Sequence, residues 1–236
     1  MLALAFGAVS LLYATVGQAG GTAFLALMAF ASFPSNVMRP TALLLNIVVT
    51  ATFSTWLFNR ESLVDWAKLR PLLLASLPTA LVGGFITLDE RLYKAVTGSV
   101  LLLAAMIIAV PRTHDGDAHR PTPSWGAIST GSVVGLVSGL TGVGGGVFLA
   151  PLLIALRWAS PKRTAALSAP FILGNSVVGL VGAMCAGQTF AADTWLAAIG
   201  GAVIGAIVGL RWWSETMTRY VLAAILGAAG IQMLFF

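Results

Sequence analysis

Charged side chains are scarce in this chain of 236 residues: only 9% are Asp, Glu, Lys or Arg, whereas 58% are hydrophobic. The mean hydropathy is +0.93. Soluble domains typically carry about 25% charged and about 45–50% apolar residues. A soluble fold of this length could not cover its surface with so few charges. The composition therefore predicts an integral membrane protein.

Cysteine and histidine are almost absent as well. Cys185 is the only cysteine, which excludes an internal disulfide and argues against a cysteine-based metal site. Both histidines, His114 and His119, lie beside Asp115 and Asp117 in a polar stretch. That cluster is more typical of a solvated loop than of a metal site. We expect no metal and no cofactor.

Acidic residues are missing from the apolar runs. Those outside the polar stretch fall at predicted segment ends: Glu61, Asp65, Asp89, Glu90, Asp193 and Glu215. Paired carboxylates for acid–base catalysis are therefore absent, and so is a buried carboxylate relay for protons. The sequence predicts a protein that is not an enzyme. Its net charge of +5 comes from scattered cations rather than a clustered basic face, so we expect no nucleic-acid partner.

The apolar runs predict helices of two lengths. Six are long enough to cross a bilayer, which takes about 20 residues: 40–58, 69–88, 92–110, 164–186, 194–210 and 218–236. Two runs, 2–16 and 125–140, have about fifteen residues, and two more, 22–33 and 147–158, have about twelve, a length typical of re-entrant or half-spanning segments. The short runs form two adjacent pairs, each joined by a glycine cluster.

The glycine clusters belong to an internal repeat. "GQAGGTAFLALM" from Gly17 matches "GVGGGVFLAPLL" from Gly142 at a shift of 125 residues, and Asn46 matches Asn175 at a shift of 129. The pattern predicts an all-α polytopic fold of two repeats, each with about five helical segments and with short broken or re-entrant helices at the glycine motifs. Residues 1–110 form the first repeat, 111–124 a polar cytoplasmic linker, and 125–236 the second repeat.

An odd number of crossings per repeat inverts the second copy relative to the first. Alternating the loops puts ten cations on one side: Arg60, Lys68, Arg70, Arg112, Arg120, Arg157, Lys162, Arg163, Arg211 and Arg219. The other side has three: Arg39, Arg91 and Lys94. The positive-inside rule makes the richer side cytoplasmic, so both termini should face outward. Inverted repeats with interrupted helices indicate a secondary transporter with a site near the midplane.

Neither glycine cluster fits a soluble nucleotide motif. A P-loop needs a lysine, and a Rossmann fingerprint needs a βαβ unit with a downstream acidic residue. Two interpretations remain: close helix packing, or helix breaks whose N–H groups and positive dipole ends face an anion. The paired positions favour a binding site. Its candidate residues are Gly17, Gln18, Gly20, Gly21, Thr22, Thr141, Gly142, Gly144, Gly145 and Gly146.

Four further residues are candidates from their matching places in the two copies. Asn46 and Asn175 sit within predicted helices, where a polar side chain either links helices or lines a site. Arg39 and Arg163 follow the short segments on opposite sides of the membrane. They are either interfacial anchors or cations of two vestibules that attract anions.

The paired glycine motifs, with "VMRPTALLLN" and "SLVDW", resemble the TauE/SafE family of sulfite-exporter-like membrane proteins over essentially the whole chain. The resemblance implies a transporter that exports sulfite, an organosulfonate or a similar small anion across the cytoplasmic (inner) membrane of a prokaryote. Its partners would be that anion and the lipid bilayer, and the sequence leaves room for a homo-oligomer. The alternatives are a passive anion channel of the same architecture and a non-transporting membrane scaffold subunit.

Overall fold

The computed structural model describes residues 5–10, 19–50, 64–109, 122–159, 161–190, 223–224, 227–228 and 230–235. Over these residues the regular structure is entirely helical, which confirms the predicted all-α class. The principal helices are α2 (Gly21–Phe30), α3 (Ser35–Val49), α5 (Trp66–Phe85), α6 (Glu90–Ala109), α7 (Ser124–Thr141), α8 (Gly146–Ala155) and α9 (Pro161–Cys185).

The helices lie where the apolar runs predict them. The two shortest predicted segments correspond to α2 and α8, which have ten residues each. Ten residues span about 15 Å, half the thickness of a bilayer core. Residues 194–210, a predicted span, lie outside the described residues, as do parts of the predicted segments 2–16, 40–58 and 218–236.

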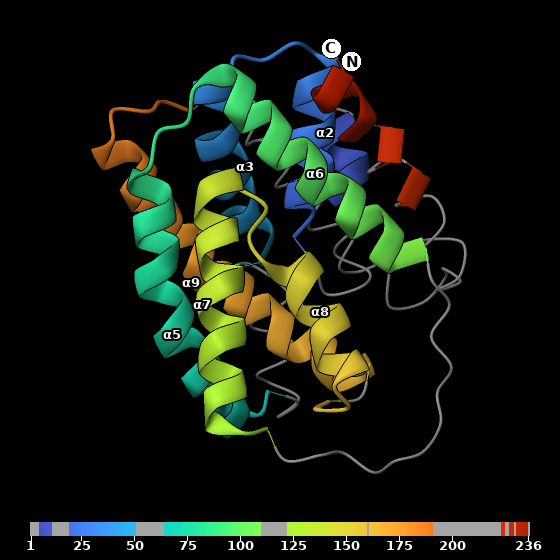
Figure 1. Ribbon diagram of the computed structural model, residues 1–236, viewed down its shortest axis with the longest axis vertical. Coiled ribbons are helices and arrows are strands. Elements are labelled where there is room, and N and C mark those ends of the chain that lie inside the picture. The colour runs from blue at the N-terminus through green and yellow to red at the C-terminus, as the bar shows by residue number, and fades with distance from the viewer. Residues whose placement is uncertain are drawn as a thin grey trace.

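Helices α5 and α7 stand side by side along the long axis of the molecule, α9 passes obliquely behind them, and α6 crosses over one end of this group (Figure 1). The contact between α5 and α7 depends on glycines spaced four residues apart on α7. A Cβ on Gly131 would lie 2.5 Å from the Leu72 carbonyl oxygen, and one on Gly135 would lie 2.5 Å from Thr79 Oγ1. This small-residue face lets two helix backbones approach closely, as in membrane helix pairs.

Large apolar side chains cover the outside of these helices. Leu74 on α5 is 73% exposed, Met106 on α6 is 59% exposed and Val133 on α7 is 64% exposed. Many polar side chains are buried instead, Asn46 and Asn175 among them. In the described part of the chain, Ala166–Cys185 is long and apolar enough to cross a membrane. Apolar groups outside and polar groups inside suit a lipid surrounding.

Backbone features recur at the shift of 125 residues that the sequence repeat has. Gly20 and Gly145, which precede α2 and α8, have φ angles of 90° and 80°. Ser32 and Arg157, after the same helices, have φ angles of 55° and 58°. The turn bonds match too: Phe33 N–H donates to the Met28 carbonyl at 3.0 Å, and Trp158 N–H donates to that of Leu153 at 2.8 Å.

The two short helices run toward opposite ends of the molecule. The Lys68 ammonium donates to the Trp158 carbonyl at 3.0 Å, so the end of α8 lies beside the start of α5. Gln232 Nε2 donates to the Ala29 carbonyl at 3.3 Å, which holds the end of α2 beside the last described residues. We call these the Lys68 end and the Arg39 end, since Arg39 contacts the C-terminal end of α5.

Candidate functional site

The break between α7 and α8 is a glycine structure. Gly142, Gly144 and Gly145 have φ angles of 85°, 84° and 80°, a region that residues with a side chain rarely adopt. Thr141 closes α7, because its hydroxyl donates to the Val137 carbonyl at 2.7 Å and accepts from Val143 N–H at 3.3 Å. These residues are buried. The chain thus turns inside the protein, where only glycine fits without strain.

The other break precedes α2. Gly20 takes the left-handed conformation and Gly21 begins the helix. Thr22 is fully buried in the first turn of α2. The remaining residues predicted for this break, Gly17 and Gln18, lie outside the described residues.

The two breaks meet, although they are separated by more than a hundred residues in sequence. A Cβ on Gly21 would lie 2.5 Å from the Val143 carbonyl oxygen and 2.5 Å from Asn46 Nδ2. A Cβ on Gly144 would lie 2.6 Å from the same amide nitrogen. Asn46 Nδ2 donates to the Gly142 carbonyl at 3.3 Å. The Asn46 amide of α3 is therefore packed between the two glycine motifs.

Both short helices begin at this meeting point. The first N–H groups of a helix have no acceptor within their own helix, and the helix dipole makes this end positive. With α2 starting at Gly21 and α8 at Gly146, two such ends converge near Asn46. Converging helix N-termini favour a negatively charged ligand.

Helix α9 forms the opposite wall. Phe171 and Ile172 lie against Gly145 and Gly146, so a Cβ on Gly145 would lie 3.1 Å from Phe171 Cε1. Asn175 is one turn further along and is fully buried, and its Nδ2 donates to the Phe171 carbonyl at 2.9 Å. The break is thus lined by apolar side chains with a few fixed polar groups.

Some polar atoms here have no hydrogen-bond partner among the described residues. They are Asn46 Oδ1, Asn175 Oδ1 and Ser138 Oγ, all buried. Ser138 lies one turn before the break, where its carbonyl accepts from Gly142 N–H at 2.9 Å. Buried polar atoms are normally satisfied, so the two that lie against the glycine motifs, Asn46 Oδ1 and Ser138 Oγ, indicate a place for a ligand or water.

Arg39 lies apart from these atoms and is 1% exposed. Its guanidinium donates to Gln188 Oε1 at 2.9 Å and to three carbonyls at the end of α5: Gly83 at 3.3 Å, Gly84 at 2.9 Å and Ile86 at 2.7 Å. A cation at a helix C-terminus compensates the negative dipole end and the unpaired carbonyls there. Arg39 therefore joins α3, the end of α5 and the residues after α9.

Arg163, the other predicted vestibule cation, is exposed in the first turn of α9. Arg39 contacts Gln188, just beyond the other end of this helix. At 25 residues, α9 is about 37 Å long. The two arginines thus lie at opposite ends of the molecule.

A model of the family described as sulfite exporter TauE/SafE matches residues 2–233 of the chain. The chain belongs to this family. It is 36% identical to the probable membrane transporter protein y4hK of Sinorhizobium fredii, over 99% of this chain and 97% of that protein. It is also 26% identical to the probable membrane transporter protein YunE of Bacillus subtilis, over 81% of this chain and 78% of that protein.

A further relative is the probable membrane transporter protein MamO of Paramagnetospirillum magneticum, with 28% identity over 99% of this chain. The chain spans 44% of MamO's length. No solved structure matches the chain. The family and the names of these relatives identify this TauE/SafE chain as a membrane transporter.

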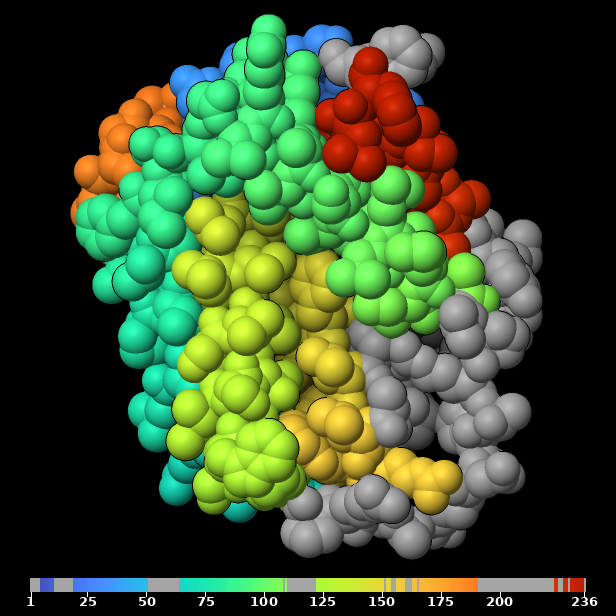
Figure 2. Space-filling view, in the orientation of Figure 1, coloured from blue at the N-terminus to red at the C-terminus, as the bar shows by residue number. Residues whose placement is uncertain are grey.

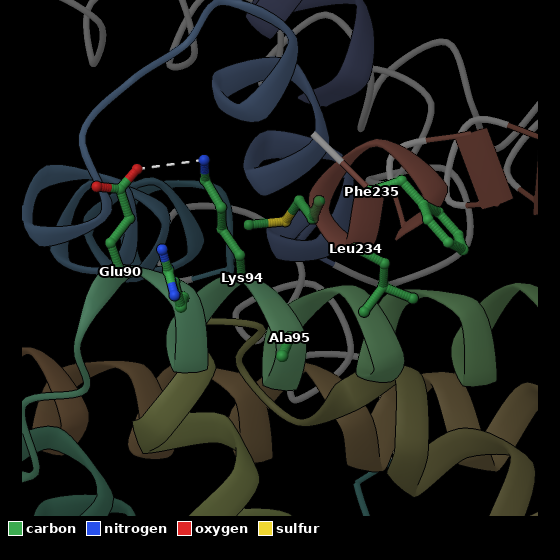
Figure 3. A pocket seen from close by; sticks show the side chains of 7 residues that line it. Glu90, Lys94, Ala95, Leu234 and Phe235 are labelled. Carbon is green, nitrogen blue, oxygen red and sulfur yellow. Dashed lines mark ion pairs between the residues drawn. The ribbon is translucent and has the colours of Figure 1, made fainter.

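Two cavities of the TauE/SafE chain lie near the Arg39 end. One, of about 210 Å³, is lined by Arg39, Tyr93 and Gln188 among others. The second, of about 430 Å³, lies between the start of α6 and the last described residues (Figure 3). It is lined by the Glu90–Lys94 ion pair, at 3.2 Å, and by apolar groups such as Leu234. Figure 2 shows these last residues packed against α6 on the surface.

Sequence reasoning missed some residues that hold the site together. Tyr93 on α6 donates from its hydroxyl to the Thr141 carbonyl at 3.1 Å, which fixes the end of α7. Gln188 binds Arg39. Tyr93 lies in the repeat element "DERLYKAV" and Gln188 in no motif, but both contacts join residues far apart in the chain, so the sequence contains no local signal for them.

Proposed function

We propose that this protein is a secondary transporter that moves a small anion, such as sulfite or an organosulfonate, across the cytoplasmic membrane of a prokaryote. The observation that carries the proposal is the meeting of two glycine-rich helix breaks around Asn46. The proposed binding residues are Gly20–Thr22, Asn46, Thr141–Gly146 and Asn175, with Gly17 and Gln18. Among the described residues, no group of three or more His, Cys, Asp and Glu side chains is placed to hold a metal ion.

We also propose that the chain consists of two inverted repeats, residues 1–110 and 125–236, joined by the linker 111–124. The recurrence of φ angles at a shift of 125 residues supports the repeat. The opposite directions of α2 and α8 support the inversion. In transporters of this kind, broken helices line a site near the membrane midplane and the two repeats move relative to each other.

The proposed orientation puts the Lys68 end in the cytoplasm. Lys68 and Arg70 begin α5 at this end, and Arg163 begins α9 there. Arg91 and Lys94 lie in the first turns of α6, with Arg39 at the opposite end. The positive-inside rule favours the cytoplasm for the Lys68 end, which makes the protein multi-pass with both termini outside. Arg163, which is exposed, would then serve a cytoplasmic vestibule, whereas Arg39 is buried and bonded to carbonyls at the end of α5 and is not proposed as a vestibule cation.

Uptake of radiolabelled sulfite, or of a sulfonate, into everted vesicles tests the proposal. We expect saturable uptake above the background of vesicles without the protein. Planar-bilayer recording separates a transporter from a channel of the same architecture, since a channel would conduct steady anion currents. If no anion in a broad panel moves above background, the proposed function is wrong.

Gly145→Leu tests the site itself. Gly145 has a φ of 80°, and a Cβ there would lie 3.0 Å from Val134 Cγ1. Gly187 has a φ of 78° but nothing within 4 Å of its Cβ position, so Gly187→Leu is a control with the same backbone strain and no crowding. We expect Gly145→Leu to abolish transport while membrane insertion continues, and Gly187→Leu to keep most of it. Full activity in Gly145→Leu would count against the site.

A further inference from the structure

Two buried asparagines, Asn46 at the breaks and Asn175 on α9, each have an acceptor atom without a partner among the described residues. An asparagine amide can be placed either way round, but here the neighbours decide its orientation. Asn46 Nδ2 faces the Gly142 carbonyl and Asn175 Nδ2 faces the Phe171 carbonyl, and a carbonyl can only accept. The NH₂ groups must therefore point at these carbonyls, and each Oδ1 atom points away from its carbonyl and can accept a hydrogen bond from another group.

Asn46 Oδ1 faces the start of α2. A Cβ on Gly21, the first residue of α2, would lie 2.8 Å from this oxygen. Asn46 is fully buried, and its Oδ1 accepts no hydrogen bond within the part of the chain that the structure describes. An acceptor that is buried without a donor costs free energy. A ligand beside Asn46 Oδ1 would therefore be stabilised by donating a hydrogen bond to this oxygen.

Asn175 Oδ1 is a second acceptor of this kind, although the Asn175 amide nitrogen bonds the Phe171 carbonyl of its own helix and not a glycine motif. It too is buried without a partner among the described residues. A Cβ on Gly179 of α9 would lie 3.6 Å from Leu43 of α3. The two helices are antiparallel, because Arg39 near the start of α3 bonds Gln188 just after the end of α9. Asn46 and Asn175, each about one turn from this contact, therefore lie at a similar level along the two helices. The site thus combines N–H donors at two helix starts with the Asn46 acceptor, and Asn175 Oδ1 is a second unpaired acceptor on α9.

We propose that the ligand of this site is an anion that also donates a hydrogen bond: a singly protonated oxyanion or a hydroxylated sulfonate. This inference rests on the proposed transport function and specifies its substrate class. The acceptor oxygens of such an anion satisfy N–H groups at the helix starts. Its O–H donates to Asn46 Oδ1 or Asn175 Oδ1. An anion without an O–H or N–H would bring only acceptors toward these oxygens, which repel it.

Two matched pairs of monoanions test this in liposomes that contain the purified full-length protein. The smaller pair, at mildly acidic pH, is hydrogensulfite and methanesulfinate, in which a methyl group replaces the hydroxyl. The larger pair is 2-hydroxyethanesulfonate and 1-propanesulfonate, which differ in the same way. Initial uptake of each radiolabelled anion is measured after subtraction of protein-free liposomes. We expect the hydroxylated member of at least one pair to be faster by about tenfold or more, because a site built to bond a hydroxyl rejects the analogue without it.

Asn46→Leu adds a variant that removes the acceptor at nearly constant size. It should reduce the preference within the pair toward unity, whereas Ser129→Ala should keep it. Ser129 bonds the Gly126 carbonyl at 3.2 Å near the start of α7, far from the break. If Asn46→Leu does not fold, the preference of the native protein for the hydroxylated anion is by itself the test of the donor requirement.

The outcomes separate the two proposals. Equal or reversed rates in both pairs overturn the donor requirement and leave the transport function standing; water would then be the partner of the two Oδ1 atoms. No movement of any of the four anions overturns the donor requirement, and it overturns the transport function as well if no other anion of the broad panel moves.

Discussion

Asn46 and Arg39 lie on the same helix, yet the structure satisfies them differently. The Arg39 guanidinium bonds carbonyl and amide oxygens of three other segments. Asn46 keeps an acceptor without a partner among the described residues. A buried group that is fully bonded rigidifies a fold, whereas one that is half bonded leaves room for a ligand. We therefore expect Arg39 to matter for stability and Asn46 for transport.

Arg39→Lys keeps the charge but loses the planar fork that reaches several carbonyls at once. Since bonds from charged donors are worth about 1.5–3 kcal/mol each, we expect a clear loss of stability. Arg91→Lys is the control, because Arg91 is exposed in the first turn of α6. Thermal unfolding of the detergent-purified proteins compares them. Equal melting temperatures for the two variants would show that the Arg39 contacts contribute little.

Gly21→Ala adds one methyl group where the two breaks meet. Its Cβ would lie 2.5 Å from both the Val143 carbonyl oxygen and Asn46 Nδ2. Overpacking of this kind costs about 1–3 kcal/mol, and here it also displaces the proposed site. We expect sulfite uptake to fall at least about tenfold, the effect of 1.4 kcal/mol.

Gly179→Ala is the matched control for this variant. A Cβ on Gly179 meets nothing closer than 3.6 Å, which is ordinary van der Waals contact, and alanine is the better helix former. Uptake and melting temperature should both be retained. If Gly21→Ala transports as well as Gly179→Ala, the breaks are not where the anion passes.

Much of the element-level structure was predictable from local composition. Helices α5, α6 and α9 follow from apolar runs, and α2 and α8 from short runs bounded by glycine. The glycine cluster at 142–146 also predicted a break, because few other residues tolerate consecutive left-handed φ angles. What could not be predicted is which residues of different elements meet. Asn46 contacts not only Gly21, in the glycine motif nearer in sequence, but also Gly142 in the other motif. This second contact depends on how α3 packs, which no local pattern encodes.

Gly135→Ala tests the packing of α7 against α5. Its Cβ would lie 2.5 Å from Thr79 Oγ1 and 2.7 Å from Ser76 Cα, so the helices would have to separate. We expect a lower melting temperature and a smaller monodisperse fraction in size-exclusion chromatography. Val133→Ala is the control on the same helix, since Val133 is 64% exposed on the outer face. Unchanged stability in Gly135→Ala would mean that close backbone approach does not hold these helices together.

At the scale of the whole molecule, the distribution of cations predicts which end faces the cytoplasm. The Lys68 end carries Lys68, Arg70 and Arg163, and more cations of the sequence are predicted on that side. Cys185 ends α9 on the opposite, Arg39 side and is exposed. Because it is the only cysteine, labelling of the native chain reports on one end alone.

A membrane-impermeant maleimide should therefore label Cys185 in intact spheroplasts. The reverse probe is Cys185→Ser combined with Ser124→Cys, since Ser124 is exposed at the start of α7 on the Lys68 side. This protein should react only after the membrane is permeabilised. Labelling of both proteins is read from a fluorescent band, with transport activity as the test that each is folded.

Labelling of the Ser124→Cys protein in intact spheroplasts, with no labelling of Cys185 in the native chain, would show the opposite orientation. The positive-inside bias would then have failed for this chain, while the meeting of the two breaks around Asn46 would stand, since this contact does not depend on which end faces the cytoplasm.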